Sequence, residues 1–382
     1  ALLGCAAGAD QRSSPSAQNL RTIGYYDAKA QQELPAESLR ADGRLTHLVL
    51  AGALKVDSNG TLHFRAPEQP GELSAEELVG RLANRSSKLV VSLRGHPDDV
   101  ALDELAEQDS VRARFATEMA ALLRAWGADG LEIEWHSDDP QGGKPATEPF
   151  DVMEQYHFAL LCRDLSGALK ATGGNRTLSV AARPGRREFA DGNFVRHYVD
   201  WLSLRAYSMR SLGDPHHSSL KDMRVALDEW SDKGVPPDQL VLGLPLFARP
   251  GAALHTAGDR NEALRMPWSK LAGEGMRSSG GDGLGDAFIE ASTGKVWWAS
   301  GVNTTRAKVE HIVEGGYGGL AFRDLHNDAR RQEPALNGAG GALVPSLVQV
   351  ATDAAREHQR LAAAKRRIAR RAAVPHQQPW SL

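Results

Sequence analysis

Short apolar runs alternate along this chain with longer segments in which apolar residues recur every three or four positions. A short apolar run is typical of a buried strand, and the longer spacing is typical of an amphipathic helix. Such alternation predicts parallel strands joined by crossover helices. The eight predicted strands are 22–26, 46–56, 88–94, 130–135, 177–182, 201–208, 240–247 and 318–325.

Two of the intervening helices carry clear local signals. Ser74 and Glu77 form the Ser-x-x-Glu pattern of a capping box, so a helix is expected to begin at this serine. The helix after Ser110 is expected to end before Gly127, which occupies the position of a C-terminal cap. The apolar residues of that helix fall on one face: Val111, Phe115, Met119, Leu122, Leu123 and Trp126.

Eight strands with helices between them predict an α/β fold, a (β/α)8 TIM barrel. In such barrels the active site lies at the carboxyl ends of the strands. The stretches 138–149 and 278–286 are rich in turn formers or glycine and are expected to be loops that border the cleft. An open doubly wound sheet is the alternative, but no glycine-rich phosphate loop follows the first strand, which disfavours a nucleotide-binding sheet.

We expect three parts: an N-terminal segment over 1–19, the barrel over 20–328, and a linker, basic helix and tail over 329–382. The first nine residues resemble the end of a signal peptide, which favours a secreted protein, and a lipid anchor on Cys5 is a less favoured alternative. The helix from about 345 to 373 is rich in arginine and lysine. It is expected to be a solvated helix followed by a frayed tail, with contact to nucleic acid, acidic lipid or a protein partner as the alternative.

The overall charge excludes few functions but disfavours two. The 382 residues carry a formal net charge of -3, which gives no general electrostatic reason to bind nucleic acid or anionic membranes. No apolar run approaches the ~20 residues of a membrane-spanning helix. The two cysteines, Cys5 and Cys162, imply no disulfide framework, and no residue pattern points to a cofactor.

Asn-x-Ser/Thr sequons begin at Asn59, Asn84, Asn175 and Asn303. Four sequons exceed what the low asparagine content predicts by chance, which favours a secreted glycoprotein. Polar turns explain the same residues equally well, because asparagine and glycine pairs are common turn formers.

The run from Asp129 to His136 alternates acidic or polar residues with large apolar ones. In a strand, successive side chains point to opposite faces, so Glu132, Glu134 and His136 share one face. Neighbouring carboxylates are costly to bury unless they are paired or solvated. The pattern therefore indicates a strand that carries a functional site.

This run resembles the Asp-Gly-x-Asp-x-Asp-x-Glu signature of glycoside hydrolase family 18, the chitinases and chitinase-like lectins. The resemblance covers about 20–328 and implies a barrel fold and a glycan ligand that contains N-acetylglucosamine. Other strand motifs that look like those of the family are Gly24-Tyr25-Tyr26, Leu45-Thr46-His47, Ser92-Leu93-Arg94-Gly95, 199–208, Leu242-Gly243-Leu244-Pro245 and Gly318-Gly319.

The resemblance also implies roles for the acidic run. In that family the last acidic residue protonates the glycosidic oxygen, and the residue two positions earlier orients the substrate's N-acetyl group, whose carbonyl oxygen is the nucleophile. Here His136 stands in the position of the proton donor and Glu134 in the orienting position. Asp129 is kept, and Glu132 replaces the other inner aspartate.

Further positions depart from the family pattern. The motif usually written Met-x-Tyr-Asp reads Arg205-Ala206-Tyr207-Ser208, so Tyr207 is kept and the aspartate is lost. Arg323 replaces the tryptophan that floors the sugar site, and Arg94 replaces a glycine. The ligand-binding positions that the resemblance implies are Tyr25, Ser92, Arg249 and Arg323.

The joint loss of acid, aspartate and aromatic floor favours a catalytically impaired chitinase-like protein, kept as a glycan-binding or structural module. An active glycoside hydrolase on an atypical N-acetylhexosamine glycan, with His136 and Glu134 as its acid and orienting groups, is the first alternative.

A metal-dependent hydrolase that uses Glu132, Glu134 and His136 is the second alternative, supported by histidines on neighbouring strand-end loops at His96, His216 and His217. We assign no metal site. The simplest interpretation of the arginines is that they neutralise the carboxylates inside the former cleft, because guanidinium groups suit bidentate pairing with carboxylates. These are Arg94, Arg205 and Arg323.

Overall fold

The computed structural model describes residues 20–40, 42–95, 100–134, 152–184, 192–208, 216–250, 264–271, 276–281, 286–329 and 345–372. Eight strands in this part of the chain form a closed parallel barrel, because β1 pairs with both β14 and β2 at the two ends of the strand order. The (β/α)8 prediction is confirmed and the open doubly wound sheet is wrong. In order around the barrel the strands are β1 (Arg21–Asp27), β14 (Gly319–Arg323), β8 (Leu240–Pro245), β7 (Trp201–Leu204), β6 (Thr177–Ala182), β5 (Gly130–Glu134), β4 (Lys88–Gly95) and β2 (His47–Val56).

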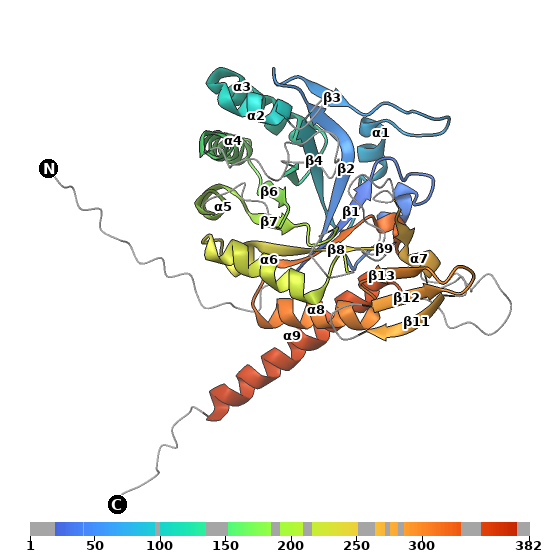
Figure 1. Cartoon of the computed structure of the whole chain (residues 1–382). Coiled ribbons are helices and arrows are strands. Elements are labelled where there is room, and N and C mark those ends of the chain that lie inside the picture. The colour runs from blue at the N-terminus through green and yellow to red at the C-terminus, as the bar shows by residue number, and fades with distance from the viewer. Residues whose placement is uncertain are drawn as a thin grey trace, which may run out of the picture.

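Helices surround the strands on the outside (Figure 1). The capping box at Ser74 is present, with the serine hydroxyl accepting from the Glu77 amide and the glutamate accepting from the serine amide. The helix before the acidic strand ends before Gly127, as predicted, and the φ of 60° at this residue is the left-handed conformation that favours glycine. The helices of the barrel are α1 (Ala75–Arg81), α2 (Val100–Glu107), α3 (Asp109–Ala125), α4 (Val152–Ala171), α5 (Asn193–Tyr198), α6 (Leu220–Asp232) and α8 (Val302–Glu314), and short 3-10 turns lie at Ala36–Leu39, Pro237–Gln239 and Leu325–Asn327.

A small second sheet, which the sequence pattern did not predict, lies between β8 and α8 along the chain. It is antiparallel, and β13 joins its two halves by pairing with both β9 and β12. The segment expected to be a loop over 278–286 instead contains parts of two strands of this sheet, and the residues between those strands lie outside the described ones. Its elements are β9 (Phe247–Pro250), β10 (Met266–Pro267), α7 (Trp268–Leu271), β11 (Met276–Gly281), β12 (Asp286–Glu290) and β13 (Val296–Ala299), and a further strand, β3 (Leu62–Phe64), pairs with β2.

The C-terminal helix α9 (Leu347–Ala372) packs against α8 with its first half, while its second half projects from the barrel (Figure 1). Its start is held by Asp328, whose carboxylate accepts from the Leu347 amide at 2.8 Å and from the Ser346 hydroxyl. Burial raises the pKa of this carboxyl group, and the hydrogen bonds oppose the rise. The predicted basic helical extension is therefore a continuous helix anchored at one end.

Two hydrophobic clusters hold the barrel together. The larger lies between the strands and the helices and includes Leu131 and Ile133, which are fully buried. The smaller fills the barrel interior with Ile23, Tyr25, Val49, Ala51, Val90, Trp201, Val241 and Ala321. Strand alternation therefore aims Glu132 and Glu134 into the barrel interior, above this apolar plug.

Candidate functional site

The site is built on the inward-facing residues of β1, β4, β5, β7 and β14, near the carboxyl ends of these strands. The alternation of β5 places Glu132 and Glu134 on the inner face, as the sequence pattern predicts. Both carboxylates are buried, with 0% and 6% of their surface exposed. Each needs a partner, because an unpaired ionised carboxylate is strongly disfavoured in such surroundings.

Glu132 is held by hydroxyl groups. Its Oε2 atom accepts from the Tyr25 hydroxyl at 2.7 Å and from the Ser203 hydroxyl at 3.2 Å. The Trp201 indole N–H in turn donates to the Ser203 hydroxyl, and the Ser179 hydroxyl lies 3.5 Å from Oε2. These neutral donors are supplied by three different strands, so the barrel itself fixes the carboxyl group in place.

Burial decides the protonation of Glu132. Removal from water raises its pKa to about 7, although the Tyr25 hydrogen bond and the charge of Arg205 oppose the rise. The Oε1 atom makes no hydrogen bond within the described part of the chain, so the charged form is poorly stabilised on that side. The neutral acid is therefore well populated at neutral pH.

Glu134, one layer nearer to the mouth of the barrel, is held in a different way. Its Oε1 atom lies 2.5 Å from the Nη2 atom of Arg205, and the two side chains are only 8% and 5% exposed. The predicted neutralisation of a site carboxylate by arginine is therefore present at this pair. Two opposite charges this close and this dry stabilise each other, and removal of either would leave an uncompensated buried charge.

Arg323 lies across the same mouth. Its guanidinium carbon is 5.6 Å from the centroid of the Tyr25 ring, and its Nε atom is 3.2 Å from Asp324. Asp324 also pairs with Arg265 at 3.2 Å. The position assigned to the aromatic floor in the sequence comparison is thus filled by a guanidinium group engaged with an aromatic ring and a carboxylate.

Tyr207 is buried beside this cluster, and its ring meets Phe247 edge to face with 6.1 Å between centroids. Gly243 lets the Tyr207 ring pack against β8, because a Cβ atom at this position would lie 2.6 Å from the Leu204 carbonyl oxygen and 3.0 Å from the Tyr207 ring. His217 stacks on Phe247 with 5.4 Å between ring centroids, and burial holds the pKa of this histidine well below its usual value. Arg249, on β9, lies close enough to His217 to lower that pKa further.

Asp129 lies at the opposite end of the strand from the other predicted site residues. It precedes β5, pairs with Arg85 at 2.6 Å and accepts a hydrogen bond from the Leu89 amide at 2.7 Å. The aspartate thus ties β5 to β4 at their amino ends. It does not meet Glu132, Glu134 or Tyr207 at the carboxyl ends, which are separated from it by the length of the strand.

Three other positions that the sequence pattern singled out are Ser92, His136 and His96. Ser92 is buried on β4 at the level of Glu132, which it faces in the strand pairing. His136 and His96 lie outside the described residues. No group of three or more His, Cys, Asp or Glu side chains that could hold a metal ion occurs within the described ranges.

A buried lysine was not predicted. Lys308 has no exposed surface and donates to the Ser218 carbonyl and hydroxyl and to the Ser300 hydroxyl at 2.8 to 2.9 Å. Burial lowers its pKa to about 7. The signal was present in the sequence, because Lys308 interrupts the apolar face of α8, between Thr304 and Ile312, at helical spacing.

The sequon asparagines Asn59, Asn84, Asn175 and Asn303 are all exposed on the surface. Their glycosylation stays a prediction. Trp297 and Trp298 point to opposite faces of β13, and Trp297 is buried in the core, as expected for one of the two.

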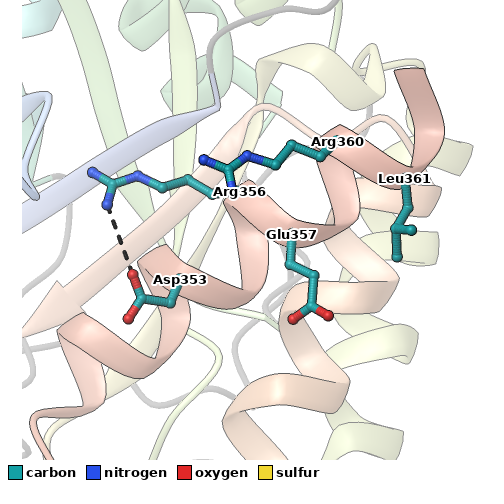
Figure 2. A pocket seen from close by; sticks show the side chains of 5 residues that line it. All are labelled: Asp353, Arg356, Glu357, Arg360 and Leu361. Carbon is teal, nitrogen blue, oxygen red and sulfur yellow. Dashed lines mark ion pairs between the residues drawn. The ribbon is translucent and has the colours of Figure 1, made fainter. Parts of the chain in front are cut away.

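The basic half of α9 is the other surface feature singled out in the sequence. Figure 2 shows the guanidinium of Arg356 directed at Asp353, 3.7 Å away. The apolar side chains of Leu361 and Ile368 are 52% and 69% exposed. Contact with a protein partner stays a prediction. A shallow hollow on this helix is lined by Asp353, Arg356, Glu357, Arg360 and Leu361.

No helix in the described part of the chain has the length and apolar character needed to cross a membrane.

The chain has relatives among chitinases. Endochitinase 1 of Metarhizium anisopliae is 24% identical over 275 residues, which cover 64% of this chain and 63% of that protein. Oviduct-specific glycoprotein of Bos taurus is 27% identical over 223 residues, which cover 53% of this chain and 40% of that protein. The matched segment therefore spans less than two thirds of either relative.

A chitinase of known structure has a similar fold. A GH18 chitinase from Cycas revoluta, solved in complex with (GlcNAc)3, superposes with a TM-score of 0.66 at 21% sequence identity, over 87% of this chain and 99% of that one. The model of the family described as Glycosyl hydrolases family 18 matches residues 21–328. Since that match spans most of the chain, including every strand of the barrel, the protein belongs to glycosyl hydrolase family 18.

Proposed function

We propose that the protein is a catalytically impaired chitinase-like protein that binds a glycan or serves as a structural module. The observation that carries this proposal is the buried Glu134–Arg205 ion pair, 2.5 Å long. In the family pattern the residue at the position of Glu134 orients the substrate's N-acetyl group. A carboxylate committed to a guanidinium group at this distance is not available for that task without breaking a buried pair, which costs several kcal/mol.

The residue at the position of the family's proton donor supports the same proposal. His136 stands where the family has the carboxylic acid that protonates the leaving oxygen. Glu132, the neighbouring carboxyl group, is enclosed beside Tyr25 and Ser203 with no exposed surface, so it is not in a position to take over that role. Arg323 adds to the argument, since a guanidinium group at the floor position offers no flat apolar surface on which a neutral sugar ring stacks.

A glycan as ligand is supported by the family and by the Cycas revoluta chitinase of similar fold, which holds an N-acetylglucosamine trimer. Secretion is supported by the leader-like residues 1–9 and by the exposure of the four sequon asparagines.

The test combines a binding and a hydrolysis measurement on the purified chain with N-acetylglucosamine oligomers. Binding without cleavage supports the proposal, and so does folding with neither, which would identify a structural module. Cleavage that disappears in His136→Ala contradicts it, because the histidine would then act as the acid of an active enzyme.

Variants toward the family pattern separate the two blocks to catalysis. His136→Glu restores an acid but leaves Glu134 paired, so we expect no turnover. Adding Arg205→Met, the residue that the family motif has at this position, releases Glu134 and is expected to give the first detectable cleavage. If His136→Glu alone were fully active, the ion pair would not be the obstacle that we propose.

A further inference from the structure

Three guanidinium groups lie on or directly after described strands at the mouth of the barrel, and described carboxylates pair with two of them. Arg94 lies on β4, Arg205 directly follows β7, and Arg323 lies on β14. All three occupy positions that face the barrel interior in the alternation of their strands. Arg205 is paired with Glu134, and Arg323 with Asp324. Arg94 is partly exposed and forms no ion pair with any described residue.

The position of Arg94 places its charge at the site. Leu93 pairs with Ile133 in the barrel register, so Arg94 lies level with Glu134 on the neighbouring strand. Arg94 therefore lies at the same end of the barrel as the Glu134–Arg205 pair. Glu132, the only other carboxyl group on this face of β5, lies lower and has a pKa of about 7, so it contributes only part of a negative charge at neutral pH.

We propose that the carboxyl end of the barrel binds a glycan that carries an anionic group, a carboxylate or sulfate, and that Arg94 contacts that group. This inference rests on the proposed glycan-binding function and names the class of glycan. A guanidinium group presents planar pairs of N–H donors that match a carboxylate or sulfate in a bidentate manner, whereas a neutral sugar hydroxyl uses only one of them. Arg323 supports the same class, because it puts a second cation where a neutral sugar would need an aromatic ring.

The experiment uses ligands that differ only in charge. The first is an oligosaccharide of alternating N-acetylglucosamine and glucuronic acid, and the second is the same oligosaccharide with its carboxyl groups reduced to alcohols. A neutral N-acetylglucosamine oligomer and its sulfated form, matched in length, distinguish a carboxylate from a sulfate. Binding of each to the full chain is measured by calorimetry at low and at moderate salt.

We expect an anionic oligosaccharide to bind about tenfold more tightly than its neutral counterpart, the effect of one charge-assisted contact. Arg94→Gln should remove most of that preference. The matched control is the double variant Arg356→Gln, Arg360→Gln on α9, which removes two exposed positive charges away from the barrel mouth. This control should keep the preference.

Three outcomes would overturn the inference. Equal affinity for charged and neutral ligands would leave glycan binding intact but refute the preference for an anion. A preference that persists in Arg94→Gln and is lost in the α9 variant would show attraction to the basic helix instead. Failure of all four ligands to bind would refute both this inference and the glycan-binding form of the proposed function.

Discussion

Replacing Glu132 by glutamine tests whether the barrel holds this carboxyl group in its neutral form. Glutamine has nearly the same shape as the protonated acid, and its amide oxygen can accept the hydrogen bonds from Tyr25 and Ser203 that now reach Oε2. The variant therefore removes the ability to ionise while keeping the contacts. Its stability relative to the wild type reports the cost of the buried charge.

The structure sets the expected magnitude. The pKa of Glu132 rises from 4.5 to about 7 on folding, which corresponds to about 3 kcal/mol at about 1.4 kcal/mol for each tenfold change. Between these two values the folded chain retains a proton that the unfolded chain has lost, so the free energy of unfolding of the wild type falls as the pH rises. Glu132→Gln lacks this loss and should gain about 3 kcal/mol over the wild type between pH 4.5 and pH 8.

Urea unfolding at several pH values between 4.5 and 8 measures this difference. The control is Glu134→Gln, which leaves the Arg205 guanidinium buried without its carboxylate and should be destabilised by several kcal/mol at neutral pH. If the stability difference between Glu132→Gln and the wild type stayed constant over this range, the carboxyl group would ionise normally in the folded state and the reasoning would be refuted.

Two further predictions concern the start of α9 and the buried lysine of α8. Asp328→Ala removes the acceptor of the Leu347 amide, so it should lower the stability of the chain by about 1 kcal/mol and speed trypsin cleavage in α9. Asp353→Ala, at an exposed position of the same helix, should change neither. Equal cleavage rates in the two variants would contradict the anchoring role of Asp328. Lys308 has its pKa lowered from 10.5 to about 7, so the folded chain lacks a proton that the unfolded chain binds and the wild type should gain stability from pH 7.5 to 9.5. Lys308→Met should gain less stability than the wild type over that range, by about 1.4 kcal/mol per pH unit, which urea unfolding at several pH values would detect. Parallel plots of stability against pH for the two proteins would show that the buried amine stays charged.

The barrel was predictable because its strands are marked by composition and its connections by local signals. The alternation of Glu132 and Glu134 with Leu131 and Ile133 defines which face is buried against helices, and period-two geometry requires no information from elsewhere in the chain. The small antiparallel sheet was missed because its strands are short, and because their pairing depends on contacts between β9 and β13, which are far apart in the sequence.

The sequence by itself determined the barrel, the strand that carries the site and the position of its carboxyl groups, because strand alternation and helix capping act between near neighbours. Only the tertiary structure decided how each carboxyl group is held. Glu134 meets Arg205 and Glu132 meets Tyr25 because barrel closure brings together residues that are up to 107 positions apart. Closure also removes water from Glu132 and so raises the pKa of that carboxyl group, whereas Glu134 is paired with a guanidinium group.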